Sequence, residues 1–318
     1  MTIKSDVLKI LEQNRNISIS GQELAKQLNV SRMSICKVIK KLKEGGYNIE
    51  ASTNKGYMLL DNNDILSSEG ISCYLDKKMD IYAYKTIDST NTQMKKFAVD
   101  NHVDYALIVA EHQSAGRGRF NRVFYSPEKQ GIYMSLLLRY NQTFNDATLI
   151  TIQSAVAIKR VIKKLCGIDT KIKWVNDLYY QGKKICGILT EAISDFESGM
   201  IEAIIIGIGI NVSTKQFPEE LLDKATSLGI ENINRSKFIA LIVNEILKII
   251  DEDFDNVLNE YKDASCVLNK KVEFRYKGQI YNGIAKDINS LGNLIVKCDN
   301  QEYTLNSGEV SIIQKNYE

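Results

Sequence analysis

Residues 20–46 read SGQELAKQLNVSRMSICKVIKKLKEGG and contain two helix starts separated by a short turn. Ser20, with Glu23 three residues later, forms a capping-box pattern that opens a short helix. Asn29-Val30 forms the turn, and Ser31 caps the next helix. That helix repeats apolar residues at the spacing of one buried face, at Ile35, Val38, Ile39 and Leu42. The stretch therefore predicts two consecutive helices joined by a tight turn.

The flanking residues extend this unit on both sides. Residues Thr2–Gln13 carry apolar side chains at helical spacing and predict a first helix. A Gly-Gly pair at residues 45–46 ends the third helix, and two short strands follow over Tyr47–Glu50 and Gly56–Leu60. Three helices and a hairpin in this order describe a winged helix-turn-helix, which we place at residues 1–62.

Positive charge gathers in this first unit. Residues 1–60 hold ten Lys and Arg against five Asp and Glu, whereas the remaining 258 residues hold 31 against 34. A basic helix in this position fits the major groove of DNA, and a wing lysine adds a contact. The residues predicted to contact DNA are Arg32, Ser34, Lys37, Lys41 and Lys55. A helical interaction module with a solvated cationic face would show the same charge count.

Beyond residue 63 the pattern changes to strands and helices in irregular alternation. Strands are predicted at Ile81–Tyr84, Tyr105–Ala110, Ile132–Leu138, Lys171–Trp174, Ile185–Ala192 and Ala203–Ile210. Helices are predicted at Asn91–Asn101, Thr148–Cys166 and Ser236–Tyr261. Because helices do not separate the strands evenly, an α+β domain with a mixed sheet is favoured over residues 63–265. Short strands then predict a small β-barrel over residues 266–318, at Val272–Tyr276, Ile280–Ile288, Leu294–Lys297 and Glu302–Leu305.

The composition favours a cytoplasmic protein without membrane contact. The densest apolar stretch, Ala203–Ile210, is far shorter than a membrane span, and residues 1–10 do not resemble a signal peptide. The six cysteines include no CxxC pair and are predicted to be reduced core thiols. Two histidines leave little room for a His-based metal centre or catalytic triad.

Two segments are too polar to belong to a hydrophobic core. Residues 88–91, DSTN, lie between a strand and a helix, where an ordinary helix cap is the plain interpretation. Residues 113–122, QSAGRGRFNR, combine two glycines with three arginines. Glycine permits close approach of backbone N–H groups, and arginine supplies forked donors for carboxylate and phosphate. A basic surface loop or an RNA-binding stretch would have the same composition.

A third polar segment, KWVNDLY at residues 173–179, predicts a β-hairpin with the residues that follow it. One strand end offers Asn176 and Asp177, and the return strand begins with Lys184, so these groups converge, although most such lysines are solvated. Residues 207–211, GIGIN, end an apolar strand. They lack the third glycine and the following helix of a dinucleotide fingerprint, which excludes a Rossmann interpretation.

The Gly-Arg loop, the Lys-Trp-x-Asn-Asp-Leu hairpin and the Gly-x-Gly-x-Asn strand end follow a winged helix here. In this combination they resemble the bifunctional biotin–protein ligase/biotin operon repressor family over nearly the whole chain. The resemblance implies a central domain like the class II synthetases and a C-terminal barrel that is SH3-like. It implies an ATP-dependent, AMP-forming ligase that makes biotinyl-5′-AMP and transfers biotin to a lysine of a biotin carboxyl carrier protein domain. It also implies that biotinyl-5′-AMP is the corepressor of a ligand-induced homodimer on the operator DNA of biotin genes.

The same resemblance assigns roles to residues of this chain. The biotin-binding positions correspond to Ser89, Thr90, Asn91, Gln113, Arg117, Gly118, Arg119 and Lys184. The nucleotide-binding positions correspond to Arg122, Phe124, Asn176 and Asn211. Lys184, Arg119 and Asp177 are the implied catalytic residues, and Asp177 is also the implied Mg²⁺ ligand. Four positions depart from the family pattern without removing a required charge: Phe120-Asn121 in place of Arg-Gly, Phe124 in place of Trp and Val175 in place of Pro.

The implied chemistry explains why the set is cationic. A biotin carboxylate that attacks the α-phosphate of ATP meets like charge, which Lys184, Arg119, Arg122 and Mg²⁺ would offset. The product is a reactive mixed anhydride, so a loop that closes over it would keep water away. Two alternatives remain open at this point: a lipoate–protein ligase, and a DNA-binding repressor that senses biotin without transferring it.

Overall fold

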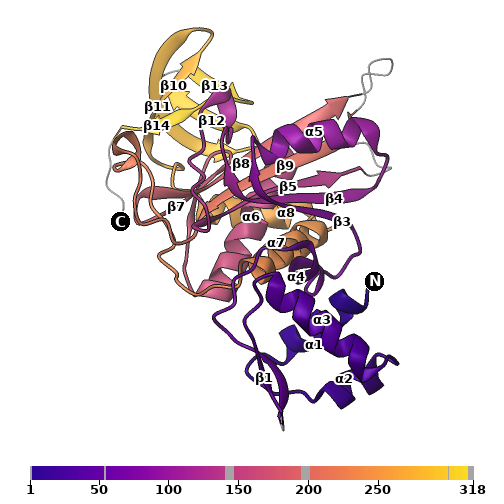
Figure 1. Ribbon diagram of the computed structural model, residues 1–318. Coiled ribbons are helices and arrows are strands. Elements are labelled where there is room, and N and C mark those ends of the chain that lie inside the picture. Colours follow the sequence, from indigo (N-terminus) through magenta and orange to yellow (C-terminus); the bar gives the residue numbers. More distant parts are fainter. Residues whose placement is uncertain (1, 54, 140–146, 195–200, 300, 314–318) are drawn as a thin grey trace. The chain divides into compact units, whose positions relative to one another are not determined.

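The computed structural model describes residues 2–53, 55–139, 147–194, 201–299 and 301–313. They form two compact units, and Figure 1 follows the chain by colour through both. The first unit comprises Met1–Ala83 and Glu231–Asn244, and the second comprises Tyr84–Ile230 and Glu245–Glu318. The domain boundaries that the sequence suggests, at residues 62 and 265, stay a prediction.

The first unit contains the winged helix-turn-helix predicted from the sequence. Its elements are α1 (Ile3–Gln13), α2 (Gly21–Gln27), α3 (Arg32–Glu44), and the antiparallel strands β1 (Ile49–Ser52) and β2 (Gly56–Leu59). The predicted caps are confirmed, because Ser20 Oγ accepts from the Glu23 N–H at 3.0 Å and Ser31 Oγ accepts from the Ser34 N–H at 3.1 Å. Each cap satisfies a backbone donor that the helix leaves unpaired.

The core of the first unit lies between its three helices and the hairpin. On α3, Ile35, Ile39 and Leu42 are buried as predicted, whereas Val38 is only partly buried. A short helix that the sequence analysis missed, α4 (Ser68–Ser72), also belongs to this unit. Its cap follows the same rule, since Ser67 Oγ accepts from the Gly70 N–H at 2.9 Å.

The second unit is built on a seven-stranded sheet. The strand order is β3-β4-β5-β9-β8-β7-β6. The bounds are β3 (Asp80–Ile87), β4 (Tyr105–Gln113), β5 (Gly131–Leu138), β6 (Lys171–Lys173), β7 (Asp177–Tyr180), β8 (Lys183–Ser194) and β9 (Ile201–Asn211). The ladders from β4 to β6 are antiparallel, and the parallel component comes from isolated bridges, Ile172 with Ser265 and Lys184 with Ala225.

Helices α5 (Thr90–Asp100) and α6 (Ala147–Cys166) cover opposite faces of this sheet (Figure 1). On β9, Ala203 and Ile205 pack in the cluster that contains Met94 of α5. Because side chains alternate along a strand, Gly207 and Gly209 lie on the same face as Ala203 and Ile205. The sheet therefore presents a glycine-lined surface beyond the N-terminal end of α5.

The helix predicted over Ser236–Tyr261 is wrong as a single element. It is two helices, α7 (Arg235–Ile249) and α8 (Phe254–Ala264), and Asp253 caps the second by accepting from the Asn256 N–H at 3.2 Å. Apolar periodicity continues through both helices, so the sequence pattern concealed the break. The predicted strand over Lys171–Trp174 ends at Lys173, because the chain turns there into β7.

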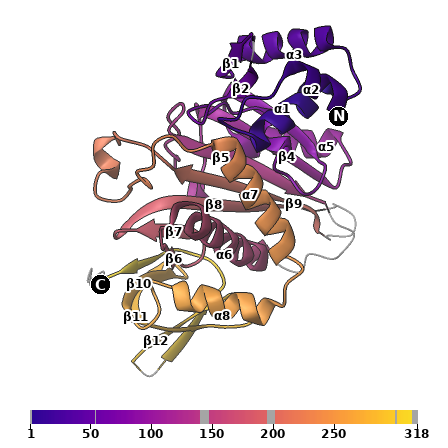
Figure 2. The same cartoon turned by 90° about the horizontal axis from the view of Figure 1, so that it is seen from below.

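The predicted C-terminal β domain is a five-stranded antiparallel sheet of order β13-β12-β11-β10-β14. Its strands are β10 (Lys271–Tyr276), β11 (Gln279–Ile288), β12 (Leu294–Cys298), β13 (Gln301–Leu305) and β14 (Val310–Ile312), of which the last was not predicted. Figure 2 shows α8 beside β11, where Lys262 and Asp287 form an ion pair at 2.7 Å. The buried indole of Trp174 also donates to the Gly292 carbonyl at 2.9 Å, which ties this sheet to the β6–β7 turn.

None of the helices in the described ranges combines the length and the apolar character needed to cross a bilayer. All six cysteines are free, but Cys186 alone is fully buried and Cys36 is exposed on α3, so the prediction of core thiols is wrong for Cys36.

Candidate functional site

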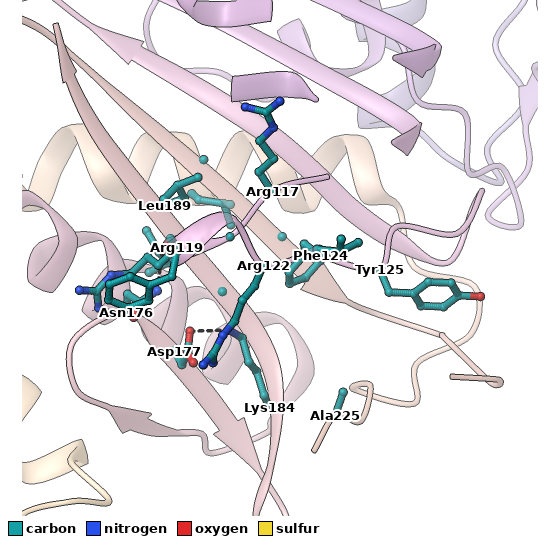
Figure 3. Close-up of a pocket in the computed structure, with 18 of the residues that line it drawn as sticks. Arg117, Arg119, Arg122, Phe124, Tyr125, Asn176, Asp177, Lys184, Leu189 and Ala225 are labelled. Carbon is teal, nitrogen blue, oxygen red and sulfur yellow. Dashed lines mark hydrogen bonds and ion pairs between the residues drawn. The ribbon is translucent and has the colours of Figure 1, made fainter. Parts of the chain in front are cut away.

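A cavity of about 630 Å³ lies within the second unit, and Figure 3 shows its lining. Every residue that the sequence analysis assigned to ligand binding or catalysis lines it: Ser89, Thr90, Asn91, Gln113, Arg117, Gly118, Arg119, Arg122, Phe124, Asn176, Asp177, Lys184 and Asn211. These residues come from positions up to 122 apart in the sequence. The tertiary structure thus brings the separate polar segments together at one place.

One end of the cavity is polar but uncharged. Ser89 caps α5, and Ser89, Thr90 and Asn91 are all buried. Gln113 joins this group, because its Oε1 accepts from the Thr90 backbone N–H at 2.9 Å and its Nε2 donates to Ser126 Oγ at 2.9 Å. Buried amides and hydroxyls held in this way have fixed orientations, which suits recognition of a neutral polar ring.

The glycines of the Gly-x-Gly-x-Asn segment form the floor of the cavity. Gly207 pairs in register with Ser135 on β5 and Leu189 on β8, and a Cβ at Gly207 would lie 2.1 Å from Asn91 Oδ1. One row further along β9, a Cβ at Gly209 would lie 2.5 Å from the Phe124 ring. The two glycines therefore make room for Asn91 and Phe124, which is a different role from that of a dinucleotide-binding loop.

The Gly-Arg loop crosses above this floor. Gly116 is required there, because a Cβ would meet the Phe124 carbonyl at 2.7 Å. Phe120 and Asn121 adopt φ values of 55° and 56°, in the left-handed region that disfavours a bulky side chain. In Figure 3 the Arg117 side chain points away from Asp177 and Lys184, whereas Arg122 extends toward them.

The other end of the cavity is charged. Lys184 Nζ lies 2.6 Å from Asp177 Oδ1 across the β7–β8 hairpin, and Figure 3 marks this ion pair. Asn176 Nδ2 donates to the Ile188 carbonyl at 2.8 Å, and its Oδ1 accepts from Arg119 at 3.2 Å. Burial lowers the pKa of the Arg119 guanidinium from its usual high value, and the nearby Asp177 carboxylate opposes this shift. A partly buried cation interacts more strongly with an anionic ligand than a solvated one does.

Arg122 is engaged by a residue that the sequence analysis missed. Its two terminal nitrogens donate to the two carboxylate oxygens of Glu309, at 2.7 and 2.6 Å. This pairing lowers the pKa of Glu309 below its ordinary value. Glu309 lies just before β14, far from the other site residues in sequence, and no local motif marks it.

Other missed residues flank the charged end of the cavity. Tyr125 and Phe217 line it as an aromatic pair with ring centres 6.2 Å apart, and Lys224 lines it from the same segment as Phe217. The Lys224 carbonyl accepts from the Lys184 backbone N–H at 2.9 Å, which joins this segment to the hairpin. Asn211 Nδ2 donates to the Thr226 carbonyl at 3.0 Å. Asn211 was predicted from the sequence and ends β9, whereas Tyr125, Phe217 and Lys224 occupy irregular segments, where sequence periodicity carries no information.

The predicted DNA-contact residues lie in the first unit. Arg32, Lys37 and Lys41 are exposed on α3, Lys55 is exposed at the tip of the hairpin, and Ser34 is partly buried because it meets its cap Ser31. The exposed side of α3 therefore carries the basic side chains Arg32, Lys37 and Lys41.

Comparisons with known proteins agree with these features. The chain matches the biotin/lipoate A/B protein ligase family over residues 83–211, a helix-turn-helix domain over residues 4–58 and the biotin protein ligase C-terminal domain over residues 267–312. The bifunctional ligase/repressor BirA of Bacillus subtilis (strain 168) is 38% identical over 232 residues, 71% of each chain. The Escherichia coli (strain K12) protein of the same name is 28% identical over 301 residues, 92% of each chain. Among solved structures, the biotin protein ligase from Aquifex aeolicus in complex with biotin and ATP has a TM-score of 0.62 at 26% identity, covering 73% of this chain and 97% of that one.

The fold, the lining of the cavity and the matches to known families together define a protein ligase of the biotin/lipoate class that carries an N-terminal helix-turn-helix domain. The chain belongs to the bifunctional biotin–protein ligase/biotin operon repressor family.

Proposed function

We propose that this protein forms biotinyl-5′-AMP from biotin and ATP and transfers the biotinyl group to a lysine of a biotin carboxyl carrier protein domain. The observation that carries the proposal is that one cavity is lined both by a cluster of neutral hydrogen-bonding side chains and by a cluster of cationic side chains. A bicyclic urea with an acid side chain needs the first for its ring and the second for its carboxylate and the nucleotide phosphates.

In the first step the biotin carboxylate attacks the α-phosphate of ATP, and diphosphate leaves. Lys184 and Arg119 lie where they would offset the repulsion between carboxylate and phosphate and stabilise the charge of the transition state. Arg122 would bind the phosphates once it is released from Glu309, and Asn176 would hold Arg119 in place through their hydrogen bond. Phe124 and Asn211 would border the adenylate.

Mg²⁺ would enter the cavity bound to ATP. In the described part of the chain no three His, Cys, Asp or Glu residues are grouped as a metal cage, and the carboxylates that line the cavity are Asp177 and Glu309. A single carboxylate fits an ion that takes most of its ligands from phosphate and water. Asp177 would supply that ligand, and the bound ion would neutralise developing phosphate charge.

In the second step the amine of the carrier lysine attacks the carbonyl of the mixed anhydride, and AMP leaves. The amine must be neutral to act as a nucleophile, so its proton must be removed nearby. Asp177 is the carboxylate beside Lys184 at this end of the cavity and would accept that proton directly or through water. The Gly-Arg loop would shield the anhydride from hydrolysis until the carrier arrives.

Labelled-biotin transfer to a purified carrier domain, with ATP and Mg²⁺, tests the ligase. We expect Lys184→Ala to lower the rate about 10²–10³-fold, the range found when one stabilising donor is removed. The matched control is Lys159→Ala, which removes a lysine paired with Asp169 outside the cavity. Absence of transfer by the wild-type protein would refute the proposal.

The helix-turn-helix supports a second role as a biotin-responsive repressor at the operators of biotin genes. The adenylate would order the Gly-Arg loop and favour a homodimer, which would place two α3 helices on a two-fold operator. Sedimentation with and without biotin and ATP tests this role. A dimerisation constant that does not respond to the ligands would contradict it.

A further inference from the structure

A second, smaller cavity of about 180 Å³ adjoins the first beneath the Gly-Arg loop. Both cavities are lined by Asn91 and Leu189, and the smaller one adds Lys95 and Glu191. Asn91 therefore has a ligand-facing side and a rear side, and the rear side is occupied by a charged pair. Neither Lys95 nor Glu191 lines the main cavity, and the hydrogen bond from Asn91 to Glu191 is a direct link between this pair and a residue that does.

The rear contacts fix the orientation of the Asn91 amide. Asn91 Nδ2 donates to Glu191 Oε2 at 2.9 Å and to the Leu189 carbonyl at 3.2 Å. Carboxylate and carbonyl oxygens only accept hydrogen bonds, so a flipped amide would place its oxygen against two acceptors. Glu191 is itself held by Lys95, whose Nζ lies 2.7 Å from Glu191 Oε1. The orientation of Asn91 is thus set by residues outside the ligand cavity.

With both N–H groups occupied, Asn91 has only its oxygen left for a ligand. The Ser135 hydroxyl lies 2.5 Å from Asn91 Oδ1 and uses one of its two lone pairs. The remaining lone pair is an acceptor in a buried setting, since Asn91 is 5% exposed. A buried acceptor favours a ligand that brings an N–H group, because a ligand without one leaves this second lone pair without a donor.

We infer that Glu191, held by Lys95, is a positioning residue that keeps Asn91 as an acceptor for an N–H group of the bound acid. The inference rests on the proposed ligase function and adds the basis of its substrate choice. Biotin carries two ureido N–H groups at its ring end, whereas the dithiolane ring of lipoate carries none. The Lys95–Glu191 pair therefore contributes to selection of biotin over lipoate.

The test measures the KM for biotin and the KM for ATP in the transfer reaction for wild type, Glu191→Ala and Glu191→Gln. Glutamine can still accept from Asn91 Nδ2, so it should restore most of the positioning, whereas alanine cannot. Glu202→Gln is the control, because Glu202 lies on the adjacent strand β9, pairs with Arg139 at 3.2 Å and lines neither cavity. A second readout is the kcat/KM ratio between biotin and an analogue methylated at one ureido nitrogen, tested for each nitrogen in turn.

For Glu191→Ala we expect the KM for biotin to rise about tenfold, the effect of one charge-assisted hydrogen bond. The KM for ATP should stay within about twofold, Glu191→Gln should lie within about threefold of wild type, and discrimination against one methylated analogue should fall in Glu191→Ala. An unchanged KM for biotin, an equal rise in the KM for ATP, or a glutamine variant as impaired as the alanine variant would each overturn the inference. If wild type transfers no biotin, the proposed function itself fails; if wild type transfers biotin and Glu191→Ala behaves identically, only this inference fails.

Discussion

A methyl group added at Gly207 would test how the floor of the cavity supports Asn91. In Gly207→Ala the new Cβ would lie 2.1 Å from Asn91 Oδ1 and 2.7 Å from its Cγ and Nδ2. Ordinary contact begins near 3.4 Å, so the amide must move by about 1 Å or more. That movement would break its hydrogen bonds to Ser135, Leu189 and Glu191.

The expected loss of stability follows from these contacts. Breaking three hydrogen bonds, each with a net contribution of about 1 kcal/mol, would lower the free energy of unfolding by about 2–3 kcal/mol, which agrees with the usual cost of overpacking a core. We expect urea denaturation of the full chain to show this loss at the transition of the second unit. The KM for biotin should rise as well, since Asn91 leaves the ligand wall.

The matched comparison is the same substitution in an Asn91→Ala background, where the clashing atoms are gone. In that background Gly207→Ala should lower the free energy of unfolding by less than about 1 kcal/mol. An equal loss of stability in both backgrounds would show that the clash with Asn91 is not the cause, and would refute the reasoning.

Three further predictions concern the charged residues. Arg119→Gly should leave the urea midpoint almost unchanged but speed the release of biotinyl-5′-AMP, measured by competition; undiminished retention would count against Arg119 as a ligand. Because Arg122 lowers the pKa of Glu309, their pair stabilises the fold above the ordinary glutamate pKa of about 4.3 and loses this effect as the pH falls through the folded-state pKa. Glu309→Gln should remove this pH-dependent contribution to the free energy of unfolding, which is at most about 1 kcal/mol for so exposed a pair. If the urea midpoint has the same pH profile in the variant and in wild type, the prediction is contradicted. Lys37→Ala should weaken DNA binding and reduce the salt dependence by about one unit of slope in a titration against salt; an unchanged slope would remove Lys37 from the phosphate contacts.

The sequence was most informative where one local rule dominates. The caps at Ser20 and Ser31 were predicted correctly, because a cap is decided by residues three positions apart. The break before α8 was missed, because the apolar repeat runs through it and only Asp253 marks the new start. Cys36 was misplaced because cysteine is usually buried, whereas this thiol lies on the exposed side of α3, where it meets the Tyr57 hydroxyl at 3.3 Å.

For the site, the sequence by itself determined the chemistry of the parts. Arginine, lysine and small polar residues in three segments indicated an anionic, partly polar ligand, and their combination indicated the family. Only the tertiary structure decided how the parts face one another. It brings the Glu309 carboxylate to the Arg122 guanidinium, packs Gly207 against the Asn91 amide and brings Glu191 within hydrogen-bond distance of that amide. These contacts join a helix, loops and strands that lie far apart in the chain. They depend on how these elements pack together and on the register of the sheet, which no short stretch of sequence encodes.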